Sequence, residues 1–298
     1  MSEPIPGTGL LRDAPDARDY NLSFIAGAPA PIDWSKEFRL PEPPNTNQGS
    51  ADCCVGESFS SFHWQLKGKP FSVRSLFAYI ALTPYGAYLR DGAKRIIDAG
   101  QETFDEAPDP LPKTAKNMRS KAGLDESLGL DDRETSFFNT NGKSIDQVAQ
   151  AIRDFGGVVF GLDVSAFGWL DKTNPRPPQA GEAIAGHALY GMGFHLHDGV
   201  KCIIAKSSWC EPGHHEHHIK NNYFESGSTY SEAFVLVPKE QLSMIRRFKV
   251  DDHGTLGVAL IVDGSFDFTV YRAKSEEHYA ALLKFYEVPD NAPTIKIP

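Results

Sequence analysis

The order of apolar and polar residues divides the chain into a helix-rich first half and a strand-rich second half. From Val55 to Leu66, apolar residues recur at steps of four, three and four, which is the spacing of one helix face, and Gly68 follows as a stop signal. Similar spacing predicts shorter helices at residues 72–82, 92–99 and 144–155. The helix that ends near Leu66 would begin near Cys54 and would be held in a core by its apolar face.

The second half carries the strand signals. Runs rich in β-branched and aromatic residues predict strands at residues 158–164, 188–194, 200–205 and 233–237. Between the halves, residues 102–130 are polar, contain prolines and show little periodicity, so we expect a long surface excursion there. A helical part beside a sheet is an α+β arrangement, and the cleft between the two parts is a common place for a ligand site.

The two ends of the chain differ from this central part. Residues 1–46 are rich in proline and are expected to be extended and to lie over the folded body. The tail, residues 241–298, is too short to bury much core of its own, so we expect it to pack on the main body or on a partner. Its pattern predicts strands at residues 244–250, 255–262 and 266–273 and a helix at 276–286.

Composition and charge narrow the possible functions. The chain has 298 residues, of which 41% are hydrophobic and 23% charged, as in an ordinary globular protein. A formal charge of −9 argues against nucleic acid as the main partner. No window approaches the roughly 18 apolar residues of a membrane span, and no secretory signal is recognised, so we expect synthesis in the cytoplasm. Four cysteines, two of them adjacent, are expected to be reduced.

Cys54 is the candidate nucleophile. It stands at the first turn of the predicted helix, where the positive end of the helix dipole favours the thiolate, the nucleophilic form. The adjacent Cys53 is a rival, and a small buried core residue is the alternative for either thiol. A cysteine nucleophile needs a base, and His187, in the run Gly186-His187-Ala188, is the best candidate.

Several segments, in the same order, resemble blocks of the papain-like cysteine peptidase family. They are residues 11–20, the loop from Gln48 to Cys54, residues 74–79, the Gly-His-Ala run and Lys206-Ser207-Ser208-Trp209. The separation of Cys54 and His187 also lies within the roughly 130–150 residues typical of papain-like enzymes. The resemblance covers about residues 10–238.

This resemblance implies a domain organisation. Residues 1–46 would be an extended N-terminal arm, too short for the helical inhibitory propeptide of many secreted relatives. Residues 47–240 would form a papain-like two-lobed domain of the α+β class, with a helical lobe to about residue 140 and an antiparallel β lobe from about residue 141. Residues 241–298 lie outside the resemblance and, from their own pattern, would be a small C-terminal α/β appendage, with strands and one helix.

The resemblance also implies a role for each site residue. Cys54 would attack an amide carbonyl and His187 would transfer the proton. Gln48 would stabilise the oxyanion together with the Cys54 backbone N–H. The family spacing of six residues from the glutamine selects Cys54 over Cys53 as the nucleophile. Ser207 would orient the imidazole of His187.

The site also departs from the family. Ser207 stands where the family has an asparagine, and its shorter, rotatable hydroxyl would orient His187 less firmly. Asp52 and Cys53 replace a small Gly-Ser pair and, with Trp209, are the expected substrate-binding neighbours. An inward-pointing Asp52 carboxylate would oppose thiolate formation by like charge. Trp209 is expected to cover the contact between Ser207 and His187.

Histidines gather in two places. His195 and His197 alternate at a predicted strand end, and four more surround Glu216 in an expected loop: His214, His215, His217 and His218. These residue types bind zinc or nickel. Dense loop histidines with no cysteine at ligand spacing are more often solvated. We therefore expect no metal and no other cofactor, and we leave open whether His214 to His218 bind an ion.

Three functions remain open at this point. The first is a cysteine endopeptidase that acts on a peptide or protein substrate. The second is a catalytically weakened structural or binding component of an assembly, such as a phage virion or an exported assembly, that docks through residues 241–298. The third uses the same thioester for acyl transfer or for hydrolysis of cell-wall peptides. No nucleic-acid or membrane partner is expected.

Overall fold

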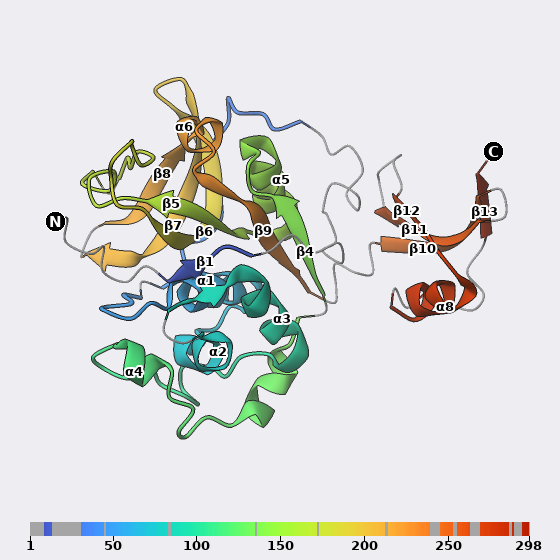
Figure 1. Cartoon of the computed structure of the whole chain (residues 1–298), viewed down its shortest axis with the longest axis horizontal. Helices are drawn as coiled ribbons and strands as arrows, with labels where there is room; N and C mark the ends of the chain where they lie inside the picture. Colours follow the sequence, from blue (N-terminus) through green and yellow to red (C-terminus); the bar gives the residue numbers. More distant parts are fainter. Residues whose placement is uncertain are drawn as a thin grey trace. The chain divides into compact units, whose positions relative to one another are not determined.

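A computed structural model of the chain describes most of the sequence. The described residues are 9–13, 31–44, 46–82, 85–134, 136–171, 173–211, 214–238, 245–252, 255–262, 269–285, 288 and 294–297. The chain divides into two compact units, residues 1–19 with 32–238 and residues 20–31 with 239–298 (Figure 1). The predicted arm lies partly outside the described residues, because residues 1–8 and 14–30 are not among them.

The helical lobe of the first unit is built around α1, Cys54–Lys67. Gly68 ends this helix in the left-handed conformation, with φ of 70°, as its stop signal predicts. The other helices are α2 Val73–Ile80, α3 Leu89–Ala99, the short α4 Ala115–Met118 and the 3₁₀ helix η2 Glu126–Asp132. The predicted helices at 72–82 and 92–99 are thus confirmed with small shifts. Helix α4 lies within the expected surface excursion, and η2 begins in it and ends two residues beyond it.

Helix α1 is buried along its first ten residues because small and large side chains alternate around it. Gly92 of α3 lies where a Cβ would approach the Phe59 ring to 2.6 Å. A Cβ on Gly56 would lie 3.1 Å from the Cβ of Phe77 in α2, so both glycines let neighbouring helices pack closely on α1. Phe62 faces the sheet instead and packs against Tyr190, with ring centroids 5.6 Å apart. The helix therefore fixes the helical lobe against the β lobe.

The β lobe is an antiparallel sheet in the order β4-β9-β5-β6-β7-β8, with the short β2 also paired to β6. Its strands are β2 Phe38–Arg39, β4 Ser136–Asn141, β5 Val158–Val164, β6 Ala185–His197, β7 Val200–Glu211, β8 His214–Lys220 and β9 Thr229–Val237. Helix α5, Ile145–Phe155, packs on this sheet, and α6, Asn221–Glu225, follows β8. Figure 1 shows the sheet and the helical lobe as two layers that meet at α1.

Two strands correct the sequence-based expectation. Residues 214–218 were expected in a loop, yet they belong to β8, because β7 offers a partner along Cys202 to Lys206. Strand β4 was not predicted, because its polar residues hide the strand signal until β9 pairs with it. The predicted strands at 158–164, 188–194, 200–205 and 233–237 are confirmed, the last three as parts of longer strands.

A short parallel pair completes the first unit. Strand β1, Leu10–Leu11, pairs with β3, Ala87–Tyr88. Close backbone contact makes this pairing dependent on glycine: a Cβ on Gly86, whose φ is 61°, would lie 1.9 Å from the Gly9 carbonyl oxygen. This pair places the described start of the arm between the two lobes.

The second unit has its own sheet, in the order β12-β11-β10-β13. Its elements are β10 Ile245–Asp252, β11 Thr255–Val262, β12 Thr269–Arg272, α8 Glu276–Phe285 and β13 Thr294–Ile297. Helix α8 packs on β11. The predicted strands and helix of the tail are present, β12 is shorter in the described residues, and β13 was not predicted.

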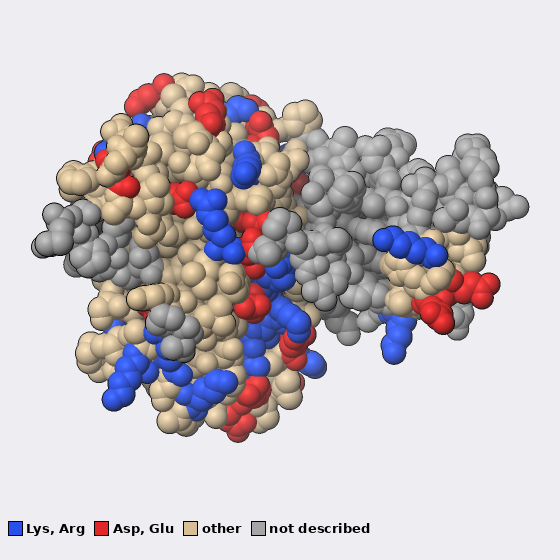
Figure 2. Space-filling model, in the orientation of Figure 1, with Lys and Arg blue, Asp and Glu red and all other residues tan. Residues whose placement is uncertain are grey.

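The surface of the first unit carries charged side chains of both signs. On the face shown in Figure 2, acidic and basic side chains are interspersed over the first unit. Such mixing allows surface ion pairs such as Arg95–Glu126, at 2.6 Å. Among the residues described, no helix combines the length and the apolar character needed to cross a bilayer.

Candidate active site

Cys54 lies at the N-terminus of α1, with Cys53 as the N-cap residue, and has 0% exposure. Its thiol makes hydrogen-bond contacts with the backbone of Ala188, Gly9 and Val55, which favour the thiolate. Burial outweighs them and raises the pKa of Cys54 to about 11. In this closed arrangement the thiol is therefore protonated at neutral pH.

His187 lies on β6, opposite Leu162 of β5, and is also fully buried. Its Nε2 is 2.9 Å from the Ser207 Oγ of β7, and its Nδ1 has no hydrogen-bond partner among the described residues. Burial, followed by the charge of His217, lowers the pKa of His187 to about 3. The imidazole is consequently neutral, with one ring nitrogen held and the other unoccupied.

The structure brings these two residues together at the interface between the lobes. The backbone of Ala188 contacts the Cys54 thiol, so the preceding residue, His187, lies beside the start of α1. Helix α1 packs against β6 along this interface. A cysteine and a histidine that have the whole helical lobe between them in sequence thus come close through the Ala188 backbone.

Two indoles enclose the imidazole. Trp209 stacks on His187 with ring centroids 3.8 Å apart, and Trp169 meets the same ring edge-on at 5.7 Å. The indole N–H of Trp169 donates to the Tyr223 hydroxyl at 2.9 Å, which fixes its position. The predicted cover by Trp209 is therefore present, whereas Trp169 was missed; its scarcity, as one of four tryptophans in the chain, was the only available signal.

Ser207 is almost completely buried between these groups. Its Oγ accepts a hydrogen bond from the backbone N–H of Trp209 at 3.1 Å, in addition to its contact with His187. The Trp209 contact limits where the hydroxyl can point. The backbone N–H of Trp209 therefore restrains the Ser207 hydroxyl, which orients His187 more firmly than a free serine hydroxyl would.

Gln48 is held in the loop before α1 by the sheet. Its backbone N–H donates to the Ser208 carbonyl at 3.1 Å, and the Ser208 hydroxyl donates to its Oε1. The side-chain Nε2 donates to the Ala51 carbonyl at 2.6 Å. The glutamine is thus fixed between β7 and the turn that leads to Cys54, and its role towards an oxyanion stays a prediction.

The carboxylate of Asp52 faces the guanidinium of Arg119. It forms an ion pair with Arg119 and accepts the Gly86 N–H at 2.6 Å. The Asp52 charge raises the pKa of Cys54 less than burial does. Cys53 is fully buried, and burial and then the charge of Glu57 raise its pKa. The expected substrate-binding roles of Asp52 and Cys53 stay predictions.

Strand β1 fills the space between the lobes beside the thiol. A Cβ on Gly9 would lie 1.9 Å from the Asp52 carbonyl oxygen, and one on Gly186 would lie 2.3 Å from the Leu10 carbonyl oxygen. Gly9 in turn accepts the Ala87 N–H at 2.8 Å. The described part of the arm therefore covers Cys54, with the Gly9 backbone in contact with the thiol.

Comparisons with known proteins agree with this geometry at the level of fold. No family model matches the chain, and no curated protein matches it significantly. Among solved structures it is similar to xylellain, a cysteine protease from Xylella fastidiosa, with a TM-score of 0.61 and 18% identity over 78% of this chain and 96% of that one. It is also similar to procathepsin L2 from Tenebrio molitor, with a TM-score of 0.60, 16% identity and coverage of 78% of both chains.

A third similar structure is the bromelain protease from Ananas comosus, with a TM-score of 0.50 and 16% identity over 68% of this chain and 99% of that one. Identities this low bear on architecture alone. This chain has the papain-like α+β fold, a helical lobe packed on an antiparallel β-sheet lobe, as in the papain-like cysteine proteases.

Proposed function

We propose that this chain is a cysteine peptidase with Cys54 as nucleophile and His187 as base. One observation carries the proposal. The imidazole of His187 is held through Nε2 by Ser207, at 2.9 Å, while its Nδ1 has no described partner and the next residue, Ala188, contacts the thiol. A base held by one nitrogen, with the other nitrogen available beside a cysteine, is the arrangement that thiol activation needs.

The reaction would proceed in two stages. Cys54 Sγ attacks the carbonyl carbon of a peptide bond as its proton passes to His187 Nδ1. The oxyanion of the tetrahedral intermediate accepts hydrogen bonds from the Gln48 side chain and the Cys54 backbone N–H. Collapse gives a thioester and releases the amine, which takes the proton from His187.

Water completes the cycle. His187, again neutral, removes a proton from a water molecule, whose oxygen attacks the thioester carbonyl. The second tetrahedral intermediate collapses to a carboxylic acid and the Cys54 thiol. Ser207 accepts the Nε2–H of the imidazolium throughout and so keeps Nδ1 directed at the reacting atoms.

The closed arrangement is the resting state in this proposal. Burial raises the pKa of Cys54 to about 11 and lowers that of His187 to about 3, and both shifts favour the neutral pair over the thiolate–imidazolium pair. Displacement of β1 would admit water and a substrate, which reduces the desolvation that causes both shifts. The substrate backbone would then lie where Gly9 and Leu10 lie now.

The test is alkylation of the thiol by iodoacetamide between pH 4 and 9, located by peptide mass spectrometry. It is done on the native chain and on a Gly9→Val variant, in which the new side chain cannot fit beside the Asp52 carbonyl. We expect Cys54 in the variant to react below pH 7, and His187→Ala to abolish this reaction. The buried Cys202 thiol serves as an internal control.

The inhibitor E64, present in the bromelain structure, provides a second probe. Irreversible loss of Cys54 reactivity after E64 treatment would support a peptidase site. Labelling that rises only near the free-thiol pKa of about 8.5, equally with and without His187, would refute the mechanism.

A second candidate, a structural or binding component, is favoured by the closed site and by the serine at position 207. Both Cys54 and His187 have 0% exposure. An unreactive Cys54 in the Gly9→Val chain would favour this candidate, and the oligomeric state of the full chain by size-exclusion chromatography would then test docking through residues 241–298.

A further inference from the structure

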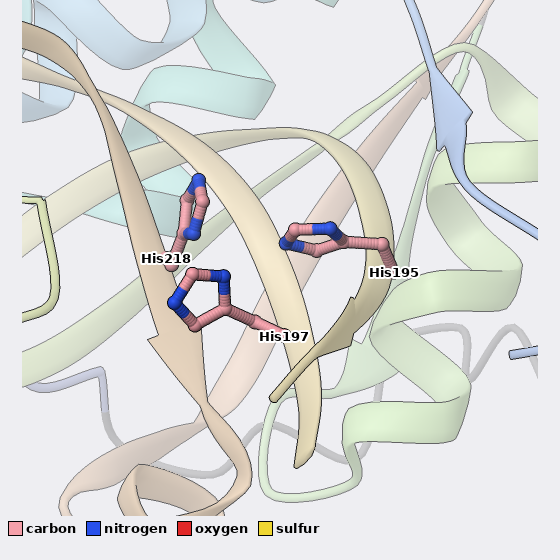
Figure 3. A group of neighbouring side chains, drawn as sticks. All are labelled: His195, His197 and His218. Atoms are coloured by element: carbon pink, nitrogen blue, oxygen red, sulfur yellow. The ribbon is translucent and has the colours of Figure 1, made fainter. Parts of the chain in front are cut away.

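Three histidines converge on one face of the β lobe, away from Cys54. His195 and His197 lie on β6, His218 lies on β8, and β7 runs between those two strands. Figure 3 shows the three imidazoles turned towards one another. One ligand nitrogen from each lies within 4.8 Å of the other two. We propose that these three side chains form a binding site for a zinc ion.

The pairing of the strands explains why these residues meet. His195 pairs with Cys202 of β7, and Ile204, two residues further along β7, pairs with His218. Side chains two residues apart on a strand share a face, so His195, His197 and His218 project from the same side of the sheet. The intervening Leu196 and His217 point the other way, and His217 packs on Trp169 near His187 instead.

The lone pairs needed for an ion are present. His195 Nε2 and His218 Nδ1 are buried atoms with no hydrogen-bond partner in the described structure. The rings pack closely, with centroids 4.9 Å apart for His195–His218 and 4.8 Å for His197–His218. Three imidazoles crowded together, two of them with an unpaired ring nitrogen, lose hydrogen bonds to water that a metal ion would replace.

A carboxylate orients one of the ligands from behind. His218 Nε2 is 2.8 Å from Glu216 Oε1, and Glu216 is itself held by Arg39, whose Nη2 donates to the same oxygen at 2.7 Å. This leaves His218 Nδ1 as the atom that faces the other histidines. A histidine that contacts a metal through one nitrogen and a carboxylate through the other is the usual arrangement around protein-bound zinc.

Zinc fits this donor set better than other common ions. Imidazole nitrogens suit zinc, whereas calcium and magnesium prefer oxygen ligands. Ligand bonds of about 2.0–2.1 Å in a tetrahedron place the nitrogens about 3.3 Å apart, so modest side-chain rotation from the present spacing would close the site. The side chains of His197 and His218 are 29% and 14% exposed, which gives an ion access and leaves room for water as a fourth ligand.

A zinc ion at this site would crosslink two strands of the sheet. An ion held by β6 and β8 would fix both strands over β7. Strand β6 carries His187, and β8 carries His217, whose charge acts on His187. The bound ion would therefore lie on the opposite face of the strands that build the candidate active site. The zinc site is independent of the proposed peptidase chemistry.

Isothermal titration of the full chain with zinc chloride tests the proposal. The protein is prepared without a polyhistidine tag, stripped with a chelator and titrated at pH 7.5. We expect one ion per chain, and a loss of affinity of at least tenfold in His195→Ala and in His218→Ala. The matched control is His278→Ala, a partly exposed histidine of α8, which should bind zinc as the native chain does.

Two further measurements keep the result decisive if an alanine variant folds poorly. Glu216→Gln removes no ligand but weakens the orientation of His218, and should lower the affinity about 10- to 100-fold. Cobalt(II) bound to the native chain should give the intense visible absorption of tetrahedral coordination. Absence of saturable zinc binding, or binding that is unchanged in a His195→Ala/His218→Ala double variant of native circular dichroism, would overturn the proposal.

Discussion

The imidazole of His187 lies flat on the indole of Trp209, with ring centroids 3.8 Å apart and planes inclined by 16°. Stacking prevents the imidazole from tilting out of its plane, but it leaves rotation within the plane unrestrained. The hydrogen bond to Ser207 supplies that second restraint. Orientation of the base is thus divided between an aromatic surface and a serine hydroxyl.

Ser207→Ala should slow alkylation of Cys54 about fivefold in the Gly9→Val background, because a hydrogen bond worth about 1 kcal/mol no longer orients His187. Ser207→Asn should retain most of the rate, since its amide oxygen also accepts the imidazole N–H. The pseudo-first-order labelling rate at pH 6.5 is the measurement. Ser231→Ala, a hydroxyl on the exposed side of β9, is the control. Equal rates in all four chains would contradict a role for Ser207.

Displacement of β1 should expose the nucleophile. Because a Cβ on Gly9 would lie 1.9 Å from the Asp52 carbonyl oxygen, Gly9→Val cannot keep the native contact. We expect labelling of Cys54 to accelerate at least tenfold and its pKa to fall, since burial is the largest cause of its elevation. Gly123→Asn, at a position with open space around it and a φ of 74° that asparagine adopts more readily than other side chains, should leave the rate unchanged. A rate in Gly9→Val equal to that of the native chain would show that β1 does not cover the thiol in solution.

Arg119→Gln should raise the pKa of Cys54. The ion pair with Arg119 neutralises Asp52, and its removal leaves a carboxylate beside the start of α1 that opposes thiolate formation. The same variant should lower the free energy of unfolding by about 1–3 kcal/mol, because a mostly buried acceptor loses its partner. The pH profile of labelling and urea denaturation are the measurements.

The Asp52→Asn/Arg119→Gln double variant isolates the charge effect. Without the carboxylate, the pH profile should return towards that of the Gly9→Val chain in which all these variants are measured. A profile that stays shifted in the double variant would assign the effect to lost packing of Arg119 on Phe77 rather than to charge.

Stability should fall in mild acid because of a buried histidine. His63 bonds the Asp132 carbonyl at 2.8 Å, and burial lowers its pKa to about 3. Between about pH 6.5 and pH 3 the unfolded chain therefore binds more protons than the folded chain, so the free energy of unfolding decreases as pH falls through this window. Each such histidine contributes a slope of up to about 1.4 kcal/mol per pH unit, and His187 acts in the same direction.

Urea denaturation at pH 7.0 and 5.5 measures this slope. A His63→Gln chain should be less stable at pH 7.0 but should lose less on acidification than the native chain. His278→Gln in α8 should keep the native pH dependence. Identical slopes for the native and His63→Gln chains would show that His63 is accessible to protons in the folded state.

The sequence predicted the elements whose pattern is local. The apolar spacing and Gly68 located α1, and β-branched residues located β5 at the bounds that the structure has. The order of motif blocks also predicted a Cys54–His187 pair; the structure places the Ala188 backbone, next to His187, in contact with the Cys54 thiol, and the catalytic pairing stays a prediction. Strand β8 was missed because histidine and glutamate carry no strand signal, and it forms only because β7 pairs with it.

Parts of the site depend on contacts between distant segments, and no local sequence pattern predicts these contacts. Strand β1 has two residues, too few for any periodicity, and its position follows from the glycines at 9, 86 and 186 that permit close backbone approach. Trp169 reaches His187 from a loop that only the folded sheet brings near. The Asp52–Arg119 pair likewise joins positions that no sequence pattern connects.

Strand β8 ends the sheet order and pairs with β7 alone among the described strands, with further hydrogen bonds from the His218 backbone N–H to the Thr173 carbonyl and from Arg39 to Glu216. A shift by one residue along β7 would exchange the two faces of the strand. His217 would leave the Trp169 surface and His218 would leave the other histidines in the same movement. The register of β8 thus determines both the contact of His217 with Trp169 and the position of His218 beside the other histidines. Insertion or deletion of one residue in β8 should disrupt both at once.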